Sequence, residues 1–474
     1  MHAERHVEVA IIGAGTAGLS ALSEVRKVTE DFLLINGGPA GTTCARVGCM
    51  PSKVLIQVAH DFHRRHVLAA EGIRGGAGLH VDLPAVLAHV RSLRDHFVRG
   101  VLKGMEGLGD RYWEGYARFK EPTVLHVEGR TVHAKKVIIA AGSSPVVPDP
   151  WRTLGKRLFT TDTFFELETL PQAIAVVGLG IIGVEMGQAL ARLGLAVTCF
   201  DRGDEIAGLT DPAVNAYMRT QLQRELQLAT GATADVQLHD GGVRVHNSAT
   251  SVQVDAVLAS LGRRPQIAQL GLDALGVQLD SHGLPPYDAT TLQVNHLPVF
   301  IAGDVNGDRP LLHEAADEGR IAGYNSVQTH AHCFQRRVRL GIVFSAPQIA
   351  FVGQPFAELQ QQDLAIGSVS FETQGRATVM AEPAGLLRVY GNPQTGQLLG
   401  AELAAPNGEH LAHLLAWAIQ RQMTVFELLQ MPFYHPTVEE GLRTALRDLL
   451  KQMHMKTAGF ELALCDSVAV ANMA

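Results

Sequence analysis

Residues 7–26 read VEVAIIGAGTAGLSALSEVR, a run that predicts a buried strand, a glycine turn and a helix. Gly13, Gly15 and Gly18 have the spacing of a dinucleotide-binding turn: one glycine allows the tight turn, one lets the backbone approach a pyrophosphate, and one lets the helix pack on the strand. The helix N-terminus supplies an anion site. The next apolar run ends in Asn36, where an acid usually holds a ribose, and asparagine can bond the same hydroxyls as a neutral partner.

A second copy of this pattern occupies residues 173–202, AIAVVGLGIIGVEMGQALARLGLAVTCFDR. Gly178, Gly180 and Gly183 again follow an apolar strand and open a helix, and the next strand ends in Asp201. Two such units in one chain indicate two dinucleotides, or one dinucleotide and one flavin dinucleotide. The pattern predicts an α/β protein with two Rossmann-like domains.

Two cysteines lie between these units, in residues 41–53, GTTCARVGCMPSK. Zinc usually needs about four ligands, and no second cysteine pair occurs in the sequence. A redox couple of Cys44 and Cys49 is therefore favoured over a metal site, and a pair of buried structural cysteines is the alternative. The spacing suits a helix start, where the peptide dipoles lower the pKa of a thiol.

Candidate polar groups follow two later apolar stretches. Asp304 comes directly after the strand predicted at 299–302, where a carboxylate can bond the ribityl hydroxyls of a flavin or simply cap a helix. In residues 431–440, MPFYHPTVEE, His435 precedes Glu440 by five positions. A histidine oriented by a carboxylate is a general acid–base unit, and a plain loop with a capping threonine is the alternative.

Three further histidines, His60, His63 and His66, lie along a helix predicted after the cysteines. His63 and His66 are one turn apart, and with no thiol beside them we expect solvated side chains rather than metal ligands, and we predict no metal site.

Composition bounds the class of protein. At 474 residues the chain is too long for one ordinary core, so about two to four domains are expected. A formal net charge of -7 gives no indication of nucleic acid or an anionic membrane as a partner, and no apolar run reaches membrane-spanning length. The N-terminus passes directly into a predicted strand, so we expect no signal peptide, and only two of the five cysteines are close in sequence. We expect a cytoplasmic protein.

Taken in order, the motifs GAGTAG, CARVGCMPSK, AAGSSP, GLGIIGVE, LGRRP, AGDV and HPTVEE resemble those of the flavin-dependent pyridine nucleotide–disulfide oxidoreductases. The resemblance extends to about residue 450 and is greatest to the dihydrolipoamide dehydrogenase branch. It implies a homodimer that uses FAD and NAD. It implies FAD contacts at Gly13, Gly15, Gly18, Asn36, Ala117, Gly142 and Asp304, and NAD contacts at Gly178, Gly180, Gly183, Asp201 and Gly262.

The same resemblance assigns roles at the reaction centre. Cys44 would exchange with the substrate and Cys49 would face the flavin, with Lys53 and Glu185 as an ion pair beside it. The acid–base pair His435 and Glu440 would come from the partner subunit.

Other branches of the family match less well. Glutathione and trypanothione reductases resemble one another in a Pro-Lys-Lys sequence after the second cysteine, where this chain has Pro51, Ser52 and Lys53. Mercuric reductases carry two adjacent cysteines near the C-terminus, where only Cys465 is found, and soluble transhydrogenases lack the paired cysteines. The chain departs from the dehydrogenase pattern at Asn36, at Arg46 in place of an asparagine, at Ala141 in place of a threonine, and in its longer tail.

These observations predict an FAD-binding domain formed by residues 1–147 and 266–335, an NAD-binding domain at 148–265, an interface domain at 336–455 and a C-terminal tail at 456–474. The expected reaction is oxidation of a dithiol to a disulfide with reduction of NAD, and the expected substrate is dihydrolipoamide on a carrier protein, or else a small dithiol. Two alternatives are an NAD(P)H-driven reductase of another disulfide and a flavin-binding redox sensor without turnover. A sensor has no need of the proton acceptor at His435.

Overall fold

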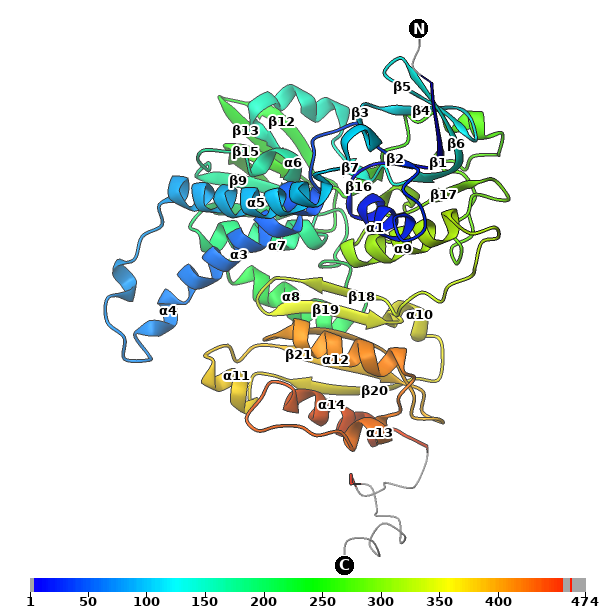
Figure 1. Cartoon of the computed structure of the whole chain (residues 1–474). Helices are drawn as coiled ribbons and strands as arrows, with labels where there is room; N and C mark the ends of the chain where they lie inside the picture. The colour runs from blue at the N-terminus through cyan, green and yellow to red at the C-terminus, as the bar shows by residue number, and fades with distance from the viewer. Residues whose placement is uncertain (1–3, 455–460, 463–474) are drawn as a thin grey trace, which may run out of the picture. The chain divides into compact units, whose positions relative to one another are not determined.

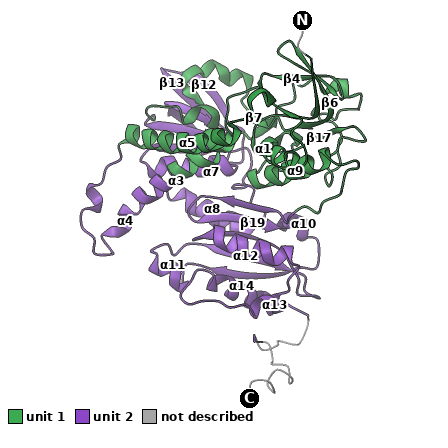
Figure 2. Ribbon diagram, viewed as in Figure 1, with its two compact units in different colours: residues 1–55, 82–170, 259–336 green, residues 56–81, 171–258, 337–474 purple. Residues whose placement is uncertain are grey.

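The computed structural model describes residues 4–454 and 461–462. Cys465, and the predicted tail apart from residues 461 and 462, lie outside this part. The chain forms two compact units (Figure 2). Unit 1 contains the chain up to Leu55 together with Asp82–Leu170 and Ala259–Arg336, and unit 2 contains Ile56–Val81, Pro171–Leu258 and the chain from Arg337 onward.

The main sheet of unit 1 is built on the first predicted strand. Strand β1 (Glu4–Ile12) pairs in parallel with β2 (Phe32–Asn36) and with β6 (Arg130–Ile139). The outer edge of β6 is shared, because β17 (Val299–Ile301) pairs in parallel with its C-terminal half and β5 (Val124–Val127) pairs antiparallel with its N-terminal half. Strands β3 (Tyr112–Glu114) and β4 (Ala117–Glu121) complete the sheet. The apolar residues of the central parallel strands are buried, as expected for strands covered on both faces.

Two helices of unit 1 pack unusually closely. Helix α1 (Thr16–Val25) follows the first glycine turn, and α9 (Leu312–Ser326) lies beside it (Figure 1). Gly319 and Gly323 of α9 face α1, and a Cβ atom on Gly319 would lie 2.2 Å from the Ala17 carbonyl oxygen. The absence of these two side chains therefore permits the crossing.

The cysteine stretch forms two helices, α2 (Thr43–Arg46) and α3 (Cys49–His63), and α3 begins in unit 1 and continues into unit 2. The long helix α5 (Leu83–Met105) begins with Asp82 as its N-cap and a proline in its first turn. The remaining elements of unit 1 are η2 (Gly109–Arg111), β7 (Ser143–Pro145), η3 (Asp149–Arg157), β8 (Leu158–Phe159), α6 (Thr161–Phe164), β16 (Arg263–Pro265), η4 (Leu272–Leu275) and η5 (Asp304–Asn306).

Unit 2 contains the second dinucleotide pattern as a parallel sheet. Its strand order is β11–β10–β9–β15, with helix α7 between β9 and β10. An antiparallel sheet, β12–β13–β14, precedes β15 in the chain. The bounds are β9 (Ala173–Val177), α7 (Ile181–Arg192), β10 (Ala196–Phe200), α8 (Pro212–Gln223), β11 (Gln227–Ala229), β12 (Asp235–His239), β13 (Gly242–His246), β14 (Ser251–Val254) and β15 (Ala256–Ala259). The segment after α3 adds α4 (Arg65–Leu68) and η1 (Gly76–Gly78).

The C-terminal part of unit 2 is an antiparallel sheet with helices packed on it. The strand order is β18–β19–β22–β21–β20; α12 contacts β19 and β22, and α14 contacts β20 and β21. The bounds are β18 (Leu340–Val343), β19 (Gln348–Gly353), α10 (Phe356–Leu359), β20 (Ala365–Ser370), α11 (Gly375–Val379), β21 (Leu386–Gly391), β22 (Leu398–Ala405), α12 (Gly408–Gln420), α13 (Val425–Leu429) and α14 (Glu440–Leu450).

The predicted α/β class and both strand–turn–helix units are confirmed. No helix of the described chain is both long and apolar enough to cross a membrane. The four-part division by cofactor stays a prediction; by contacts alone, the second dinucleotide unit and the C-terminal sheet belong to one compact unit.

Candidate active site

The first glycine turn has the geometry that its spacing predicts. Gly13 has a φ of 108°, and a Cβ atom there would lie 2.2 Å from the Ala140 carbonyl oxygen. A Cβ atom on Gly18 would lie 1.8 Å from the Gly13 carbonyl oxygen, so glycine is required at both positions. Beside Gly15, at the start of α1, no atom lies within 4 Å of an ideal Cβ position. Open space at a helix N-terminus suits a phosphate.

Asn36, at the end of β2, holds this turn. Its Oδ1 accepts a hydrogen bond from the Ala14 N–H at 3.2 Å, and its Nδ2 donates to the Gly38 carbonyl oxygen at 2.7 Å. The amide therefore uses both of its polar ends inside the protein.

The second turn repeats the arrangement in unit 2. Gly178 has a φ of 101°, the space beside Gly180 is open, and the buried Gly183 lies in the first turn of α7. Asp201, directly after β10, accepts hydrogen bonds from the Leu179 N–H at 2.5 Å and from the Gly203 N–H at 2.8 Å. Each carboxylate oxygen thus holds one backbone group, which fixes the side chain at the turn.

A third cluster of predicted residues gathers where β7 pairs with β16. Gly142 and Gly262 precede these strands with φ values of 73° and 87°, and both have open space at the Cβ position. The Ser143 hydroxyl donates to Asp304 Oδ2 at 2.7 Å and accepts from Arg263 Nε at 2.8 Å. All of these residues belong to unit 1, including Gly262.

Ser143 and Arg263 were missed from the sequence because their roles depend on this strand pairing. The one available signal was the pair of polar stretches after apolar strands, AAGSSP and LGRRP.

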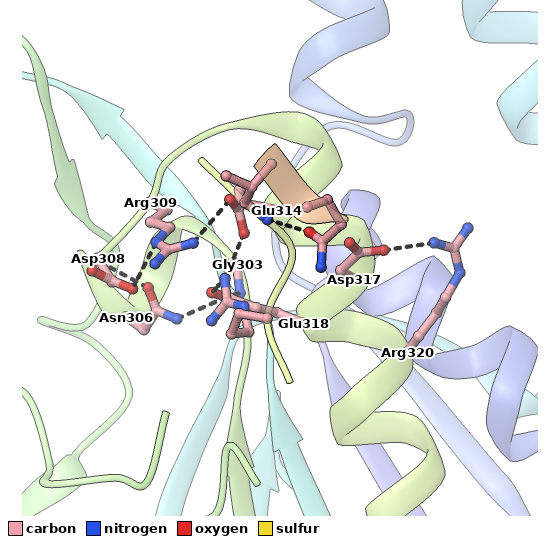
Figure 3. A network of polar contacts seen from close by, with 11 residues as sticks. Gly303, Asn306, Asp308, Arg309, Glu314, Asp317, Glu318 and Arg320 are labelled. Carbon is pink, nitrogen blue, oxygen red and sulfur yellow. Dashed lines mark hydrogen bonds and ion pairs between the residues drawn. The ribbon is translucent and has the colours of Figure 1, made fainter. Parts of the chain in front are cut away.

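A buried network holds the turn that carries Asp304 (Figure 3). Glu318 is fully buried in α9, and its Oε2 accepts from the Gly303 N–H at 2.6 Å and from Asn306 Nδ2 at 2.8 Å. Its Oε1 accepts from Arg336 at 2.8 Å, and Arg336 also bonds Glu314 at 2.7 Å. Burial raises the pKa of Glu318, and these bonds oppose that shift. The i, i+4 spacing of the two glutamates on α9 was the missed signal.

The two cysteines lie at successive helix starts in unit 1 and are not joined by a disulfide. The Cys49 side chain is hydrogen-bonded to Cys44 and raises the pKa of the Cys44 thiol, and burial raises it further. The Lys53 charge and a backbone bond from Cys49 act in the opposite direction. The expectation that the helix start lowers the thiol pKa is therefore wrong for Cys44, because two adjacent thiols share one site for negative charge.

The predicted acid–base pair forms in unit 2. His435 Nδ1 lies 3.0 Å and 3.1 Å from the two carboxylate oxygens of Glu440, the first residue of α14. The His435 bond lowers the pKa of Glu440, and the Thr437 N–H lowers it further. The His435 side chain is 81% exposed, so its other ring nitrogen is accessible.

Ala117, a predicted FAD contact, is a buried residue of β4. Lys53 and Glu185, the predicted ion pair, lie in different units. Lys53 belongs to α3 in unit 1, near enough to Cys44 to affect its pKa. Glu185 is buried in α7 of unit 2 and accepts the Phe344 N–H at 2.9 Å. Their ion pair stays a prediction.

Two histidines of α3 lie near charged groups that are distant in sequence, and the expectation of a solvated side chain is wrong for His63. His60 Nε2 lies 3.3 Å from Glu382, an acid more than 300 residues away in sequence. His63 is half-buried, and burial together with the Arg192 charge lowers its pKa to about 4.

These turns fit bound dinucleotides, because a Cβ atom at Gly15 or Gly180 would fill the open space that a pyrophosphate needs. Two such turns, a thiol pair and a histidine–carboxylate pair define a dinucleotide-dependent oxidoreductase acting on thiols or disulfides.

Comparisons with known proteins support this class of oxidoreductase. The model of the pyridine nucleotide-disulphide oxidoreductases matches residues 7–319, and that of their dimerisation domain matches residues 340–446. The chain belongs to this family, whose members use FAD and a pyridine nucleotide, and its dihydrolipoyl dehydrogenase relatives use FAD and NAD.

Dihydrolipoyl dehydrogenase of Thermus scotoductus is 30% identical over 460 residues, covering 94% of this chain and 98% of that protein. Leghemoglobin reductase of Vigna unguiculata is also 30% identical, covering 92% of this chain and 86% of that protein. The crystal structure of LpdA from Mycobacterium tuberculosis superimposes with a TM-score of 0.80 at 25% identity, covering 94% of this chain and 100% of that one.

Proposed function

We propose that the protein oxidises a dithiol to a disulfide and reduces NAD, with protein-bound dihydrolipoamide as the substrate. The observation that carries this proposal is the pair of thiols in contact within unit 1, where the Cys49 side chain and burial raise the pKa of Cys44. A dithiol substrate needs such a pair, because each turnover forms one disulfide and opens another.

The proposed roles of the side chains follow from their surroundings. In the oxidised enzyme Cys44 and Cys49 form the disulfide, and the substrate thiolate attacks the Cys44 sulfur. Cys49 is the leaving thiolate, and the nearby Lys53 charge stabilises it. His435 takes the proton from the substrate thiol, since only the thiolate attacks, and Glu440 holds the imidazole through Nδ1.

FAD, when bound, supplies the two-electron link between the thiol pair and the nicotinamide. Gly13, Gly15, Gly18 and Asn36 would hold its adenosine and pyrophosphate, and Asp304 would bond its ribityl chain. NAD would lie on the second glycine turn, with Asp201 at its ribose.

We further propose a cytoplasmic homodimer. The match to a dimerisation domain supports it, as does the exposure of His435, which lies in a different unit from the cysteines. Each active site would then combine the cysteines of one protomer with His435 and Glu440 of the other.

One observation favours a second candidate, an NAD(P)H-driven reductase of an anionic disulfide. Arg46 lies between the cysteines, and its Nε is buried without a hydrogen-bond partner in the described chain. An unpartnered N–H on an arginine that lies between the two cysteines in sequence would favour a carboxylate or phosphate on the substrate. The names of the relatives, which include a leghemoglobin reductase, leave the substrate open.

Steady-state turnover separates the two candidates. The holoenzyme is supplied with dihydrolipoamide or reduced lipoylated carrier plus NAD, and in parallel with oxidised glutathione plus NADH or NADPH. The proposal expects the highest kcat/KM with the lipoylated carrier and no change of more than about threefold in Arg46→Asn. Faster reduction of glutathione disulfide, lost in Arg46→Asn, would establish the second candidate instead.

A further inference from the structure

A side-chain cluster outside the proposed active site lies where β1 and β6 begin, on one face of the unit 1 sheet. His6 and His133 are direct partners in the parallel register of these strands, and Glu4 is two residues before His6. Because side chains alternate along a strand, Glu4 and His6 point to the same face, and His133 stands beside them.

The imidazole rings of His6 and His133 are stacked and nearly parallel. Their ring centroids are 4.7 Å apart with an interplanar angle of 11°, which matches the spacing of neighbouring strands. One nitrogen of each ring and one Glu4 carboxylate oxygen all lie within 4.8 Å of one another. In the described chain these three side chains make no hydrogen bond or ion pair with other residues, so small side-chain rotations can bring the ligand atoms closer.

Neighbouring cations do not compete with a metal for these ligands. Lys135, one pleat further along β6, is bonded to Glu8 of β1 at 2.9 Å. Arg5 alternates to the other face and bonds Asp110 at 3.1 Å. The carboxylate of Glu4 is therefore the uncompensated charge of the cluster, and it favours a cation.

We propose that Glu4, His6 and His133 bind a divalent transition-metal ion, of which Zn²⁺ is the probe. Two imidazoles and one carboxylate are a ligand set for zinc, copper or nickel, whereas calcium and magnesium prefer oxygen ligands alone. Three protein ligands leave a fourth position for water. The proposal departs from the sequence-based expectation of no metal, which had no access to this cluster because His6 and His133 are more than 120 residues apart and only the strand register unites them.

The site is remote from the first glycine turn. Seven residues of extended strand separate His6 from Gly13, which is about 23 Å. A metal here would join the start of β1 to β6 without touching the thiols or the cofactor turns. We therefore expect it to stabilise unit 1 and to leave turnover unchanged.

The test is zinc titration by calorimetry of the oxidised FAD-loaded holoenzyme, with the cysteine pair closed so that its thiols do not bind zinc. The variants are His6→Gln, His133→Gln and Glu4→Gln. His246→Gln is the matched control, because His246 also lies on a strand with an aspartate at 3.4 Å but belongs to no three-ligand cluster within the described residues. All variants are checked for flavin content and for the thermal midpoint without zinc.

We expect one zinc ion to bind the unmodified protein and the control equally. Each histidine variant should bind it at least about tenfold more weakly, and the zinc-induced rise in thermal midpoint should disappear. Equal affinity in the unmodified protein and both histidine variants would overturn the proposal, as would the absence of binding at 1:1 stoichiometry in the unmodified protein. If a histidine variant does not fold, Glu4→Gln, altered at an exposed side chain, decides the outcome by the same criterion.

Discussion

The two glycine turns of this protein are nearly identical in backbone and different in charge. In each, the residue that ends the second strand accepts the N–H of the residue after the first glycine: Asn36 from Ala14 at 3.2 Å, and Asp201 from Leu179 at 2.5 Å. Asn36 then donates to a carbonyl group, whereas Asp201 accepts a second N–H. The fold requires only an oxygen acceptor at this position. The fold therefore does not determine whether this residue is neutral or charged, and the cofactor bound at each turn can. Exchanging the two residues tests this difference between the turns.

The largest difference between the two glycine turns is that a pair of cysteines follows only the first of them in the chain. We expect Cys49→Ser to retain FAD but to abolish dithiol oxidation, since no disulfide can form. NADH oxidation with an artificial acceptor should persist, because it needs the two turns alone. Stopped-flow and steady-state assays measure both rates, and Cys333→Ser, altered at an exposed thiol, is the control. Loss of the artificial-acceptor activity in folded Cys49→Ser would assign the thiol to cofactor binding.

His435→Ala should reduce dithiol oxidation by about a hundredfold to ten-thousandfold, the usual contribution of a general base. Neither turn contains His435, so FAD content and artificial-acceptor activity should not change. The lowered pKa of Glu440 keeps its carboxylate ionised at neutral pH, so Glu440→Gln should have a smaller effect of the same kind. His239→Ala, at an exposed histidine 3.2 Å from Asp240, is the matched control. A near-normal rate in His435→Ala would exclude this residue from the reaction.

The substitution Asp201→Asn places at the second turn the residue type that Asn36 provides at the first turn. The amide oxygen can still accept the Leu179 N–H, while the charge that repels a 2′-phosphate is removed. Repulsion in a partly desolvated site is worth on the order of a few kcal/mol, so a preference for NAD of about a hundredfold should largely disappear. Arg263 does not offset it, since it is bonded to Ser143.

The measurement is kcat/KM for NAD and NADP, with the exposed Glu205→Gln as a control for charge alone. Equal use of the two cofactors by the unmodified enzyme would show that the exposed Arg202 outweighs Asp201.

The reciprocal change, Asn36→Asp, places a carboxylate against the Gly38 carbonyl group and loses that hydrogen bond. One such bond contributes about 1 kcal/mol, so FAD affinity should fall by up to about tenfold. Asn36→Ala, which loses both bonds, should have the larger effect. Fluorescence titration of the apoprotein with FAD measures it. Unchanged affinity in Asn36→Ala would mean that the first turn does not depend on its strand end.

The smallest expected effect concerns stability near the helix of the second turn. Burial, together with the charge of Arg192, the last residue of α7, lowers the pKa of His63 from 6.5 to about 4. Between these pH values the unfolded chain binds a proton that the folded chain does not, so stability falls as the pH decreases through this window. Because His63 is half-exposed, solvent screening reduces the effect to about 1 kcal/mol.

Urea unfolding at pH 7 and pH 4.5 measures this loss of stability. His63→Gln should flatten the difference between the two pH values, and His66→Gln, at an exposed neighbour, should not. The same slope in all three proteins would exclude His63 as its source.

Local pattern predicted much of this molecule. Apolar runs and glycine spacing sufficed for both turns, for Asp304 after its strand and for the contact of His435 with Glu440, because each depends on residues close in sequence. Contacts that depend on the pairing of distant strands or helices could not be predicted this way. Ser143 meets Arg263 only because β7 pairs with β16, and His60 meets Glu382 only in the folded chain.

The close crossing of α1 and α9 has a consequence for biosynthesis. Ala17 and Ala21 leave the ribosome at the start of translation, but Gly319 and Gly323, which cover them, follow about 300 residues later. At 5–20 residues per second, the apolar face of α1 waits roughly 15–60 s for its partner. Strand β17, which completes the parallel edge of β6, is also late. The second dinucleotide unit emerges whole during that interval, so unit 1 is begun first but is completed only after that unit has emerged, and its first helix, α1, is the segment that a chaperone would have to protect.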